Sequence, residues 1–228
     1  MQCWGSGTDG KLGYGDNFGG EQPRPSPILL AGTQIVDIAA GHQSTCAVLA
    51  DGSARCWGRM QDGPCIGCEE EGSVEAGFTT ADTATPIRFE APIRKVALGK
   101  DAACVILDDG QLRCWHAEDD GTAILGTGIK PQRTLTSSGI HRLSPGNAAA
   151  IDLGGPVELV RVGMIHNVLC AVRRDGALFC WGKNNPPGIL GYARSDDIGD
   201  DETPASVGPV PFRVPAEKGE APPASDEP

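Results

Sequence analysis

A Cys-Trp dipeptide that recurs along the chain is the feature that most restricts its fold. The dipeptide occurs at residues 3–4, 56–57, 114–115 and 180–181, and glycine follows the tryptophan in three of these four copies. Because the dipeptide persists while the spacing varies, the units differ by loop insertions. A period of several tens of residues is typical of solenoids and propellers.

A second cysteine lies ten residues upstream of the last three Cys-Trp dipeptides, and an Asp-Gly pair stands midway between the two cysteines. Asp-Gly between alternating apolar residues is a strong signal for a β-hairpin. If Ala50, Asp51 and Gly52 form a three-residue loop with the glycine in the left-handed region, Cys46 lies directly opposite Cys56. The same centring applies to the other two units.

Directly opposed residues of antiparallel strands lie about 4.5 to 5.5 Å apart at Cα, within the range that a disulfide accepts. Alternation along each strand also places both cysteines on one apolar face. We therefore expect three structural disulfides, Cys46–Cys56, Cys104–Cys114 and Cys170–Cys180.

Another short alternating strand precedes each hairpin, and a glycine-rich turn with a buried leucine, such as Leu12 or Leu190, follows the tryptophan. Three or four strands in each unit make one propeller blade. The predicted fold class is all-β, with three complete β-propeller repeats, partial blades at both ends, and an incomplete or open ring. The repeats are expected over residues 1–214, with hairpins near 35–58, 93–115 and 159–181, and residues 215–228 as a disordered acidic tail.

Charge and cysteine content restrict the partners and the compartment. The net charge of -11 disfavours binding to nucleic acid, and the chain has no apolar run long enough to span a membrane. Nine cysteines indicate an oxidising, extracytoplasmic compartment. Residues 1–5 do not resemble a signal peptide, so we expect that this signal was lost with upstream sequence.

Cys65 and Cys68 form the sharpest local motif, a Cys-x-x-Cys pair in a glycine turn. A small structural disulfide or a pair of packed thiols is the favoured interpretation, and redox chemistry and metal binding are the alternatives. A redox pair needs a helix N-terminus, and a zinc site needs a second pair of ligands.

The remaining polar residues do not form a recognised catalytic or metal motif. The histidines lack paired-ligand spacing, and His42 is expected to be a buried, hydrogen-bonded structural residue. A solvated loop is favoured over a calcium site for the acidic cluster. No catalytic, cofactor-binding or metal-binding residue is predicted. The residues weighed here are His42, His116, His141, His166, Asp196, Asp197, Asp200, Asp201 and Glu202.

The repeat unit resembles that of the regulator of chromosome condensation family, with Trp-Gly, a leucine turn, a proline, a valine strand, Gly-x-x-His and an Asp-Gly hairpin. The best match covers residues 4–58 and includes Leu12–Gly13, Pro27, Val36–Ile38, Gly41–His42 and Asp51–Gly52. The cysteine-bearing form is similar to an extracytoplasmic bacterial branch, and residues 190–206 resemble a blade linker found there.

The chain departs from the family pattern at His116, Lys100 and Ile165, so its middle and last repeats have drifted. The resemblance implies a closed ring of about seven blades, but the sequence holds three complete hairpins, and Cys3 has no cysteine upstream. We interpret the chain as a fragment, a chain with a misassigned start or a degenerate paralogue.

We expect a non-enzymatic binding module that presents propeller loops to a protein or glycan, without a cofactor and without membrane insertion. A propeller lyase or hydrolase is the alternative, with scattered candidates at His116, Glu118, Asp119 and Asp120. The resemblance also raises nucleotide exchange on the GTPase Ran and chromatin binding, which the acidic charge and the paired cysteines disfavour. Self-association that completes the ring is a further alternative.

Overall fold

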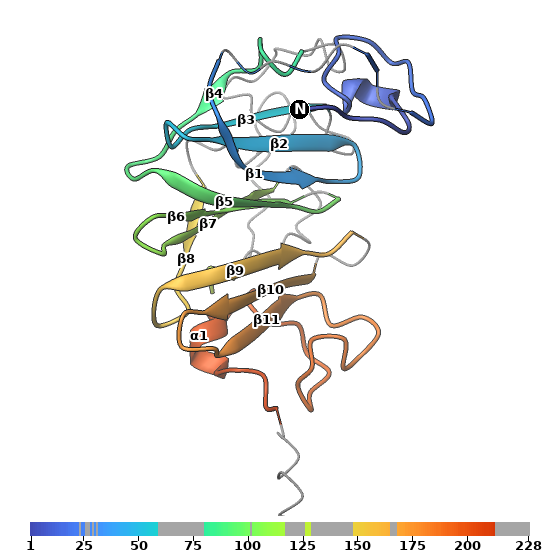
Figure 1. Ribbon diagram of the computed structural model, residues 1–228. Coiled ribbons are helices and arrows are strands. Elements are labelled where there is room, and N and C mark those ends of the chain that lie inside the picture. The colour runs from blue at the N-terminus through green and yellow to red at the C-terminus, as the bar shows by residue number, and fades with distance from the viewer. Residues whose placement is uncertain are drawn as a thin grey trace, which may run out of the picture.

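Three antiparallel β-sheets, stacked one on the next, form the framework of the described part of the chain (Figure 1). The computed structural model describes residues 1–22, 24–25, 28, 30, 32–58, 80–100, 102–116, 126–128, 148–164 and 168–212. The array does not close into a ring in this part of the chain. The predicted all-β class with an open arrangement of propeller blades is therefore confirmed.

Each sheet is one blade, and the strands of a blade follow one another in chain order. We call the three sheets blade 1, blade 2 and blade 3. Blade 1 contains β1 (Ile35–Ala40), β2 (Ser44–Leu49), β3 (Ala54–Gly58) and β4 (Pro86–Ile87); blade 2 contains β5 (Ile93–Leu98), β6 (Ala102–Leu107), β7 (Leu112–His116) and β8 (Ala149–Ile151); blade 3 contains β9 (Val157–Val162), β10 (Val168–Arg173) and β11 (Leu178–Gly182).

The central hairpin of each blade turns at the Asp-Gly pair, as the sequence predicts. In blade 1 Gly52 has φ of 80°, and the Leu49 N–H donates to the Ser53 carbonyl at 2.8 Å, which closes the three-residue loop. The Asp51 carboxylate holds this turn by accepting from the Ser53 N–H at 3.0 Å and from the Ser53 hydroxyl at 2.6 Å. A glycine suits this position because the left-handed region strains any residue with a Cβ.

The predicted register is also confirmed, since Cys46 pairs with Cys56, Cys104 with Cys114 and Cys170 with Cys180. Leu49 and Ser53 form a hydrogen-bonded pair. Hydrogen-bonded and non-hydrogen-bonded pairs alternate along an antiparallel hairpin, so Cys46 and Cys56, three positions further from the turn, form a non-hydrogen-bonded pair. Such pairs bring the strands closest together. The Cα atoms of each cysteine pair lie 4.1 Å apart, closer than we expected.

Both faces of the blades are apolar, because the blades stack face to face. We call the face of blade 1 with Cys46, Val48, Ala54 and Cys56 its cysteine face, and the opposite face, which carries Trp57, its tryptophan face; the same terms apply to blades 2 and 3. The cysteine face of blade 1 packs on Val96, Leu98, Val105, Leu107 and Trp115 of blade 2. In the same way, the cysteine face of blade 2 packs on blade 3, where Val160, Leu169 and Trp181 are buried.

Two smaller units flank the blades. Before blade 1, Met1 and Ile28 exchange backbone hydrogen bonds at 2.7 and 3.2 Å, and Gly5 pairs with Gly20. A short 3-10 helix, η1 (Thr8–Gly10), lies in the loop between Gly5 and Gly20. After blade 3, α1 (Pro204–Val207) lies beside β11, and the Val210 N–H donates to Leu178 at 2.7 Å. Within the described residues, no helix is long and apolar enough to cross a membrane.

Candidate functional site

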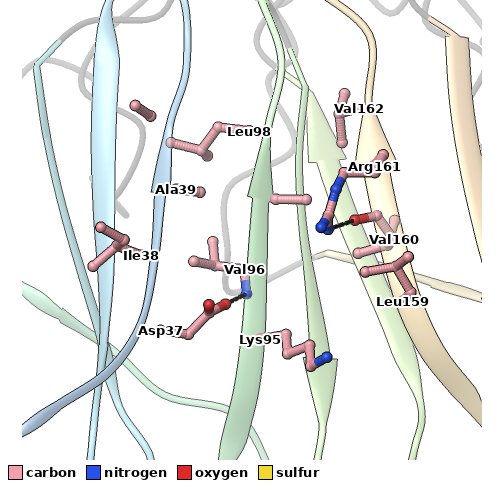
Figure 2. A pocket seen from close by; sticks show the side chains of 12 residues that line it. Asp37, Ile38, Ala39, Lys95, Val96, Leu98, Leu159, Val160, Arg161 and Val162 are labelled. Atoms are coloured by element: carbon pink, nitrogen blue, oxygen red, sulfur yellow. Dashed lines mark hydrogen bonds between the residues drawn. The ribbon is translucent and has the colours of Figure 1, made fainter.

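A groove of about 280 Å³ crosses the first strands of all three blades (Figure 2). Because β1, β5 and β9 lie in rigid sheets, the side chains along this groove are held in fixed positions. The lining residues are Asp37, Ile38, Ala39, Ala40, Lys95, Val96, Ala97, Leu98, Leu159, Val160, Arg161 and Val162.

One acidic and two basic side chains lie along this groove. Asp37 of β1 accepts a hydrogen bond from the Val96 N–H of β5 at 2.9 Å, which links blades 1 and 2 (Figure 2). The exposed Arg161 donates to the neighbouring Val160 carbonyl at 2.8 Å. Lys95 Nζ lies 3.7 Å from Glu158 Oε1. The groove therefore presents two cations among aliphatic side chains.

Glu158 connects blades 2 and 3 beside the groove. Its Oε1 atom accepts from Arg94 Nη1 at 2.9 Å, and Arg94 Nη2 also donates to the Val157 carbonyl at 3.1 Å. The hydrogen bond from Arg94 lowers the pKa of Glu158 below its usual value. Glu158 therefore stays ionised and offsets part of the positive charge near Lys95.

The chemistry of this groove suits recognition more than catalysis. Among the residues that line it there is no hydroxyl, thiol or imidazole, and its one carboxylate, Asp37, already accepts a hydrogen bond from the Val96 N–H. Ammonium and guanidinium groups bind carboxylates through charge-assisted hydrogen bonds. The aliphatic lining adds apolar contact area for a bound chain.

A second hollow, of about 420 Å³, lies between the β6–β7 turn and the segment that joins β8 to β9. Asp109, Asp152 and Arg174 supply its charged groups. The carboxylates already accept from backbone groups of their own turns, Asp109 from Gln111 at 2.9 Å and Asp152 from Gly154 at 2.7 Å. We therefore regard the groove across the first strands as the better candidate site.

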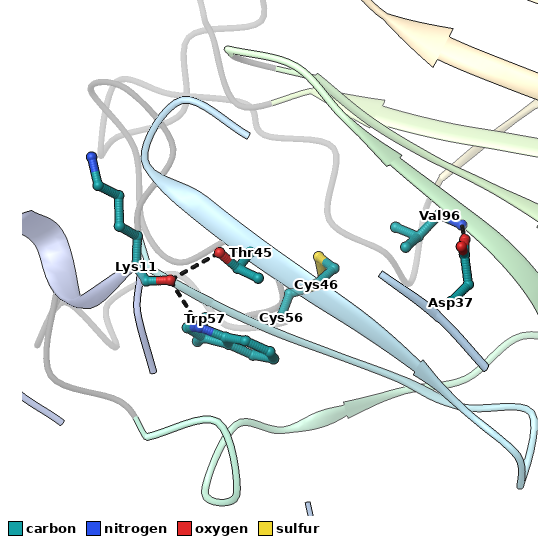
Figure 3. The surroundings of a disulfide bond; sticks show 7 residues. All are labelled: Lys11, Asp37, Thr45, Cys46, Cys56, Trp57 and Val96. Atoms are coloured by element: carbon teal, nitrogen blue, oxygen red, sulfur yellow. Dashed lines mark hydrogen bonds between the residues drawn. A yellow bond between two sulfur atoms is a disulfide. The ribbon is translucent and has the colours of Figure 1, made fainter. Parts of the chain in front are cut away.

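None of the six hairpin cysteines lines the groove; five of them are buried, and Cys170 is half-buried. In each pair the sulfur atoms are at bonding distance, 2.00 Å for Cys46–Cys56, 2.15 Å for Cys104–Cys114 and 2.11 Å for Cys170–Cys180. Figure 3 shows the first pair beside Trp57, whose indole Nε1 donates to the Lys11 carbonyl at 3.0 Å. Each cysteine pair therefore links the two strands of its hairpin and takes no part in lining the groove.

His42 is exposed, so the expectation that it is buried was wrong. It belongs to the turn between β1 and β2, where its backbone N–H donates to the Gly99 carbonyl at 3.4 Å and its side chain points out of the core. Apart from the acidic residues 196–202, the other candidates of the sequence lie outside the described residues, except His116, of which the backbone alone is described. These candidates are Cys65, Cys68, Glu118, Asp119, Asp120, His141 and His166.

The acidic loop after blade 3 brings three carboxylates together. Oxygen atoms of Asp200, Asp201 and Glu202 lie within 4.8 Å of one another. Burial and the neighbouring Asp201 raise the pKa of Glu202, while Arg194 pairs with Glu202 at 3.2 Å. Arg194 therefore neutralises part of the negative charge of this cluster.

Sequence reasoning did not find the groove residues Asp37, Lys95 and Arg161. A charged residue at alternate positions of a short strand is typical of a solvated strand face. The available signal was that all three charges fall within the first strand of a repeat. Strands at equivalent positions of successive blades lie side by side, so such charges line one groove.

The stacked sheets of three or four strands, with turns that join one blade to the next, define a β-propeller whose ring is open in the described part of the chain. Family comparison agrees, because two models described as the regulator of chromosome condensation (RCC1) repeat match residues 3–48 and 35–63. Residues 3–63 of the chain therefore carry repeats of the RCC1 family.

Relatives of known identity extend the likeness over most of the chain. The ultraviolet-B receptor UVR8 of Arabidopsis thaliana is 28% identical over 204 residues, which cover 86% of this chain and 40% of the receptor. The RCC1-like G exchanging factor-like protein of Mus musculus is 27% identical over 85% of this chain and 39% of its own length. The chain thus spans about two fifths of the length of these relatives.

Solved structures show the same fold. Prp20p from Saccharomyces cerevisiae superposes with a TM-score of 0.63 at 21% identity, covering 92% of this chain and 46% of Prp20p. Human WBSCR16 gives a TM-score of 0.61 at 22% identity, covering 86% of this chain and 45% of that protein. The described array thus corresponds to slightly less than half of each of these two propellers.

Proposed function

We propose that this chain is a non-enzymatic binding module that uses the groove across β1, β5 and β9 to hold a protein partner. The observation that carries this proposal is the pair of cations, Lys95 and Arg161, among aliphatic side chains in a chain whose net charge is -11. A locally basic groove on an acidic molecule favours an acidic segment of a partner and directs it to the groove, because the acidic surface elsewhere repels that segment.

Rigid positioning supports this role. The groove strands are the first strands of three blades, and each blade is held by a hairpin with a cysteine pair at its centre. A site on ordered strands loses little conformational entropy when it binds a partner. The proposal therefore needs no rearrangement of the array.

We further propose that the module works in an extracytoplasmic compartment, with all three hairpin cysteine pairs oxidised in the native protein. The support is that three cysteine pairs occupy the same register in three blades. Structural disulfides persist in oxidising compartments and are rare in the cytosol.

Two other functions compete with this proposal. The names of the relatives assign different activities to the same repeat, a receptor in one case and a G exchanging factor-like protein in another. Nucleotide exchange on a small GTPase is therefore a real alternative, and a propeller lyase or hydrolase is the second. A glycan ligand for the groove is the remaining alternative to a protein.

The test compares two charge-reversed variants of the full oxidised chain. Lys95→Glu with Arg161→Glu changes the groove, and Lys11→Glu with Lys183→Glu makes the same change of charge outside it. Binding is measured against extracytoplasmic proteins, with hits repeated as purified pairs, and against a glycan array. Loss of two charge-assisted contacts weakens binding of the true partner by at least about tenfold.

The groove variant is expected to lose a purified protein partner that the control variant keeps. Equal binding by both variants would contradict the groove assignment, and binding to glycans alone would replace the protein partner. In parallel, the chain is added to Ran loaded with a fluorescent nucleotide. Faster nucleotide release would favour the exchange-factor alternative over the proposal.

A further inference from the structure

The joint between blades 2 and 3 has the same framework as the joint between blades 1 and 2. Ile87 of β4 and Ile151 of β8 occupy equivalent places, because each pairs with the residue two positions before the second hairpin cysteine. The next residue is Arg88 in blade 1 and Asp152 in blade 2, and a proline that lies against the turn glycine follows four residues later in both. The two joints can therefore be compared position by position.

The two joints differ in the charge that faces the turn aspartate. In the first joint, Arg88 Nη2 donates to Oδ2 of Asp51, the aspartate of the β2–β3 turn, at 2.8 Å. The equivalent aspartate of the β6–β7 turn is Asp109, and the residue equivalent to Arg88 is the exposed Asp152. The second joint thus has a carboxylate in the place where the first has a guanidinium.

The hollow of about 420 Å³ lies at this second joint. Both aspartates line it, together with the buried apolar side chains of Leu112, Ile151 and Leu153. Its volume falls in the range of roughly 300 to 1,000 Å³ that is typical of ligand pockets. An arginine side chain lays its methylene groups on apolar surface and directs its charged end to carboxylates. The lining of the hollow offers both.

The two carboxylates keep capacity to accept further hydrogen bonds. Asp109 accepts from the backbone N–H and the side-chain amide of Gln111 at 2.9 and 3.0 Å, and Asp152 accepts from the Gly154 N–H at 2.7 Å. A carboxylate has about four acceptor positions. Each aspartate can therefore hold its own turn and still bind a cation.

The cations of the second joint are directed elsewhere. Arg174 also lines the hollow, and its Nε atom lies 3.8 Å from Glu158 Oε2. In blade 3 the turn aspartate, Asp175, pairs with Arg173. Of the turn aspartates of the three described hairpins, Asp109 is thus the one without an ion pair in the described part of the chain.

We propose that this hollow binds an arginine side chain of a partner polypeptide, with the guanidinium on Asp109 and Asp152 and the methylene groups on the apolar lining. The occupant follows from blade 1, where the guanidinium of Arg88 takes the equivalent place. A guanidinium carries several N–H donors in one plane, enough for two carboxylates. The hollow shares no residue with the groove across β1, β5 and β9, so the two sites recognise opposite charges at different places.

The experiment titrates the full oxidised chain with Nα-acetyl-arginine amide and follows the backbone amides by NMR. The matched ligand is the citrulline analogue, whose urea group has nearly the same shape and no charge. We expect a Kd on the order of 1 mM for the arginine amide, with binding at least about tenfold weaker for the citrulline analogue. Shifts of the Gln111 and Gly154 amides, which donate to the two carboxylates, locate the site.

Asp152→Arg gives the sharpest test in the protein, because it places in blade 2 the residue that blade 1 has at position 88. Its guanidinium is expected to pair with Asp109 and fill the hollow, so binding of the arginine amide falls at least about tenfold. The midpoint of urea unfolding is not expected to fall. Asp152→Asn removes the charge alone and weakens binding several-fold, whereas Glu21→Gln, at an exposed carboxylate elsewhere, leaves binding unchanged.

Three results would overturn the proposal: equal affinity for the arginine and citrulline compounds, unchanged binding in Asp152→Arg, or shifts that lie away from the hollow. Free arginine separates the two sources of the ligand. An arginine residue of a polypeptide predicts that the capped amide binds at least as tightly as the free amino acid, and clearly tighter binding of the free amino acid contradicts it. Lys95→Glu with Arg161→Glu is expected to leave this binding unchanged, so failure of the groove proposal is seen independently.

Discussion

The carbonyl of Gly52 accepts a hydrogen bond from the N–H of Ile93 at 2.9 Å, which ties the turn of blade 1 to the first strand of blade 2. The same bond recurs one blade further on, where Val157 donates to Gly110 at 2.9 Å. Each turn glycine also lies against a proline of the next blade, Pro92 or Pro156. The joint between blades is therefore made largely by the backbone and by close contact at a glycine.

Replacing Gly52 by alanine is expected to destabilise the protein more than the same change at Gly176. Both glycines have positive φ, 80° and 89°, so both variants carry backbone strain. A Cβ at Gly52 would lie 2.7 Å from Pro92 Cβ, whereas a Cβ at Gly176 meets nothing within 4 Å. We expect a further loss of about 1 to 3 kcal/mol for Gly52→Ala, measured by urea unfolding. Equal losses of unfolding free energy in the two variants would show that the contact between residue 52 and Pro92 relaxes without cost.

Removing one hairpin disulfide is expected to lower stability under oxidising conditions. The pair Cys46 and Cys56 is at most 3% exposed and closes a short loop, so replacing both by alanine costs about 2 to 3 kcal/mol in the free energy of unfolding. Urea unfolding with and without reductant measures this cost. If reductant leaves the wild-type midpoint unchanged, the cysteines are not oxidised in the protein, and the proposed compartment is wrong.

Trp57 is expected to contribute more to stability than Trp4, although both follow a cysteine. The indole of Trp57 is fully buried and donates to the Lys11 carbonyl, which also accepts from the Thr45 hydroxyl at 2.8 Å (Figure 3). Trp57→Phe loses this hydrogen bond and leaves a small void, at a cost of about 2 kcal/mol. Trp4→Phe at an exposed site is the control, with a change under about 0.5 kcal/mol. Thermal unfolding followed by circular dichroism compares the two.

The stability contributed by Asp51 is expected to depend on acid pH. Hydrogen bonds from the Ser53 hydroxyl, from the Ser53 N–H and from Arg88 lower the pKa of Asp51 to about 2. Because this pKa lies below the ordinary value of 3.8, the contribution is complete above that value and is lost as the pH falls towards about 2.

Asp51→Asn should therefore destabilise the protein at pH 7 by roughly 0.5 to 1 kcal/mol, with the difference from wild type vanishing near pH 2. Unfolding at a series of pH values measures this difference, and Glu21→Gln is the control for loss of an exposed carboxylate. A difference that persists unchanged at low pH would mean that the turn does not depend on the charge of Asp51.

The sequence predicts the hairpins well because their register depends on local chemistry. An Asp-Gly pair centres each loop, and the cysteines ten residues apart then face each other, as Cys46 and Cys56 do. Pro86–Ile87 illustrates what local patterns miss. This fourth strand has two residues and no alternation, and it is a strand because β3 offers an open edge for it to pair with.

The groove and the exposure of His42 were beyond sequence reasoning for a different reason. The groove joins Asp37, Lys95 and Arg161, which are far apart in the chain and meet because successive blades stack. Likewise, His42 sits in a turn at the rim of the stack, where neighbouring blades approach through backbone groups and leave its side chain in solvent. Both features depend on how the blades are placed, and a single repeat does not contain that information.

The turn-to-strand bond between Gly52 and Ile93 makes the molecule modular. Since the bond uses backbone groups and recurs between Gly110 and Val157, it demands little of the side chains on either blade. Each blade then interacts with its immediate neighbours, and the folding free energy of the array is close to a sum of blade and neighbour contributions. An array joined in this way can gain, lose or exchange a whole blade while the surfaces between the others stay unchanged.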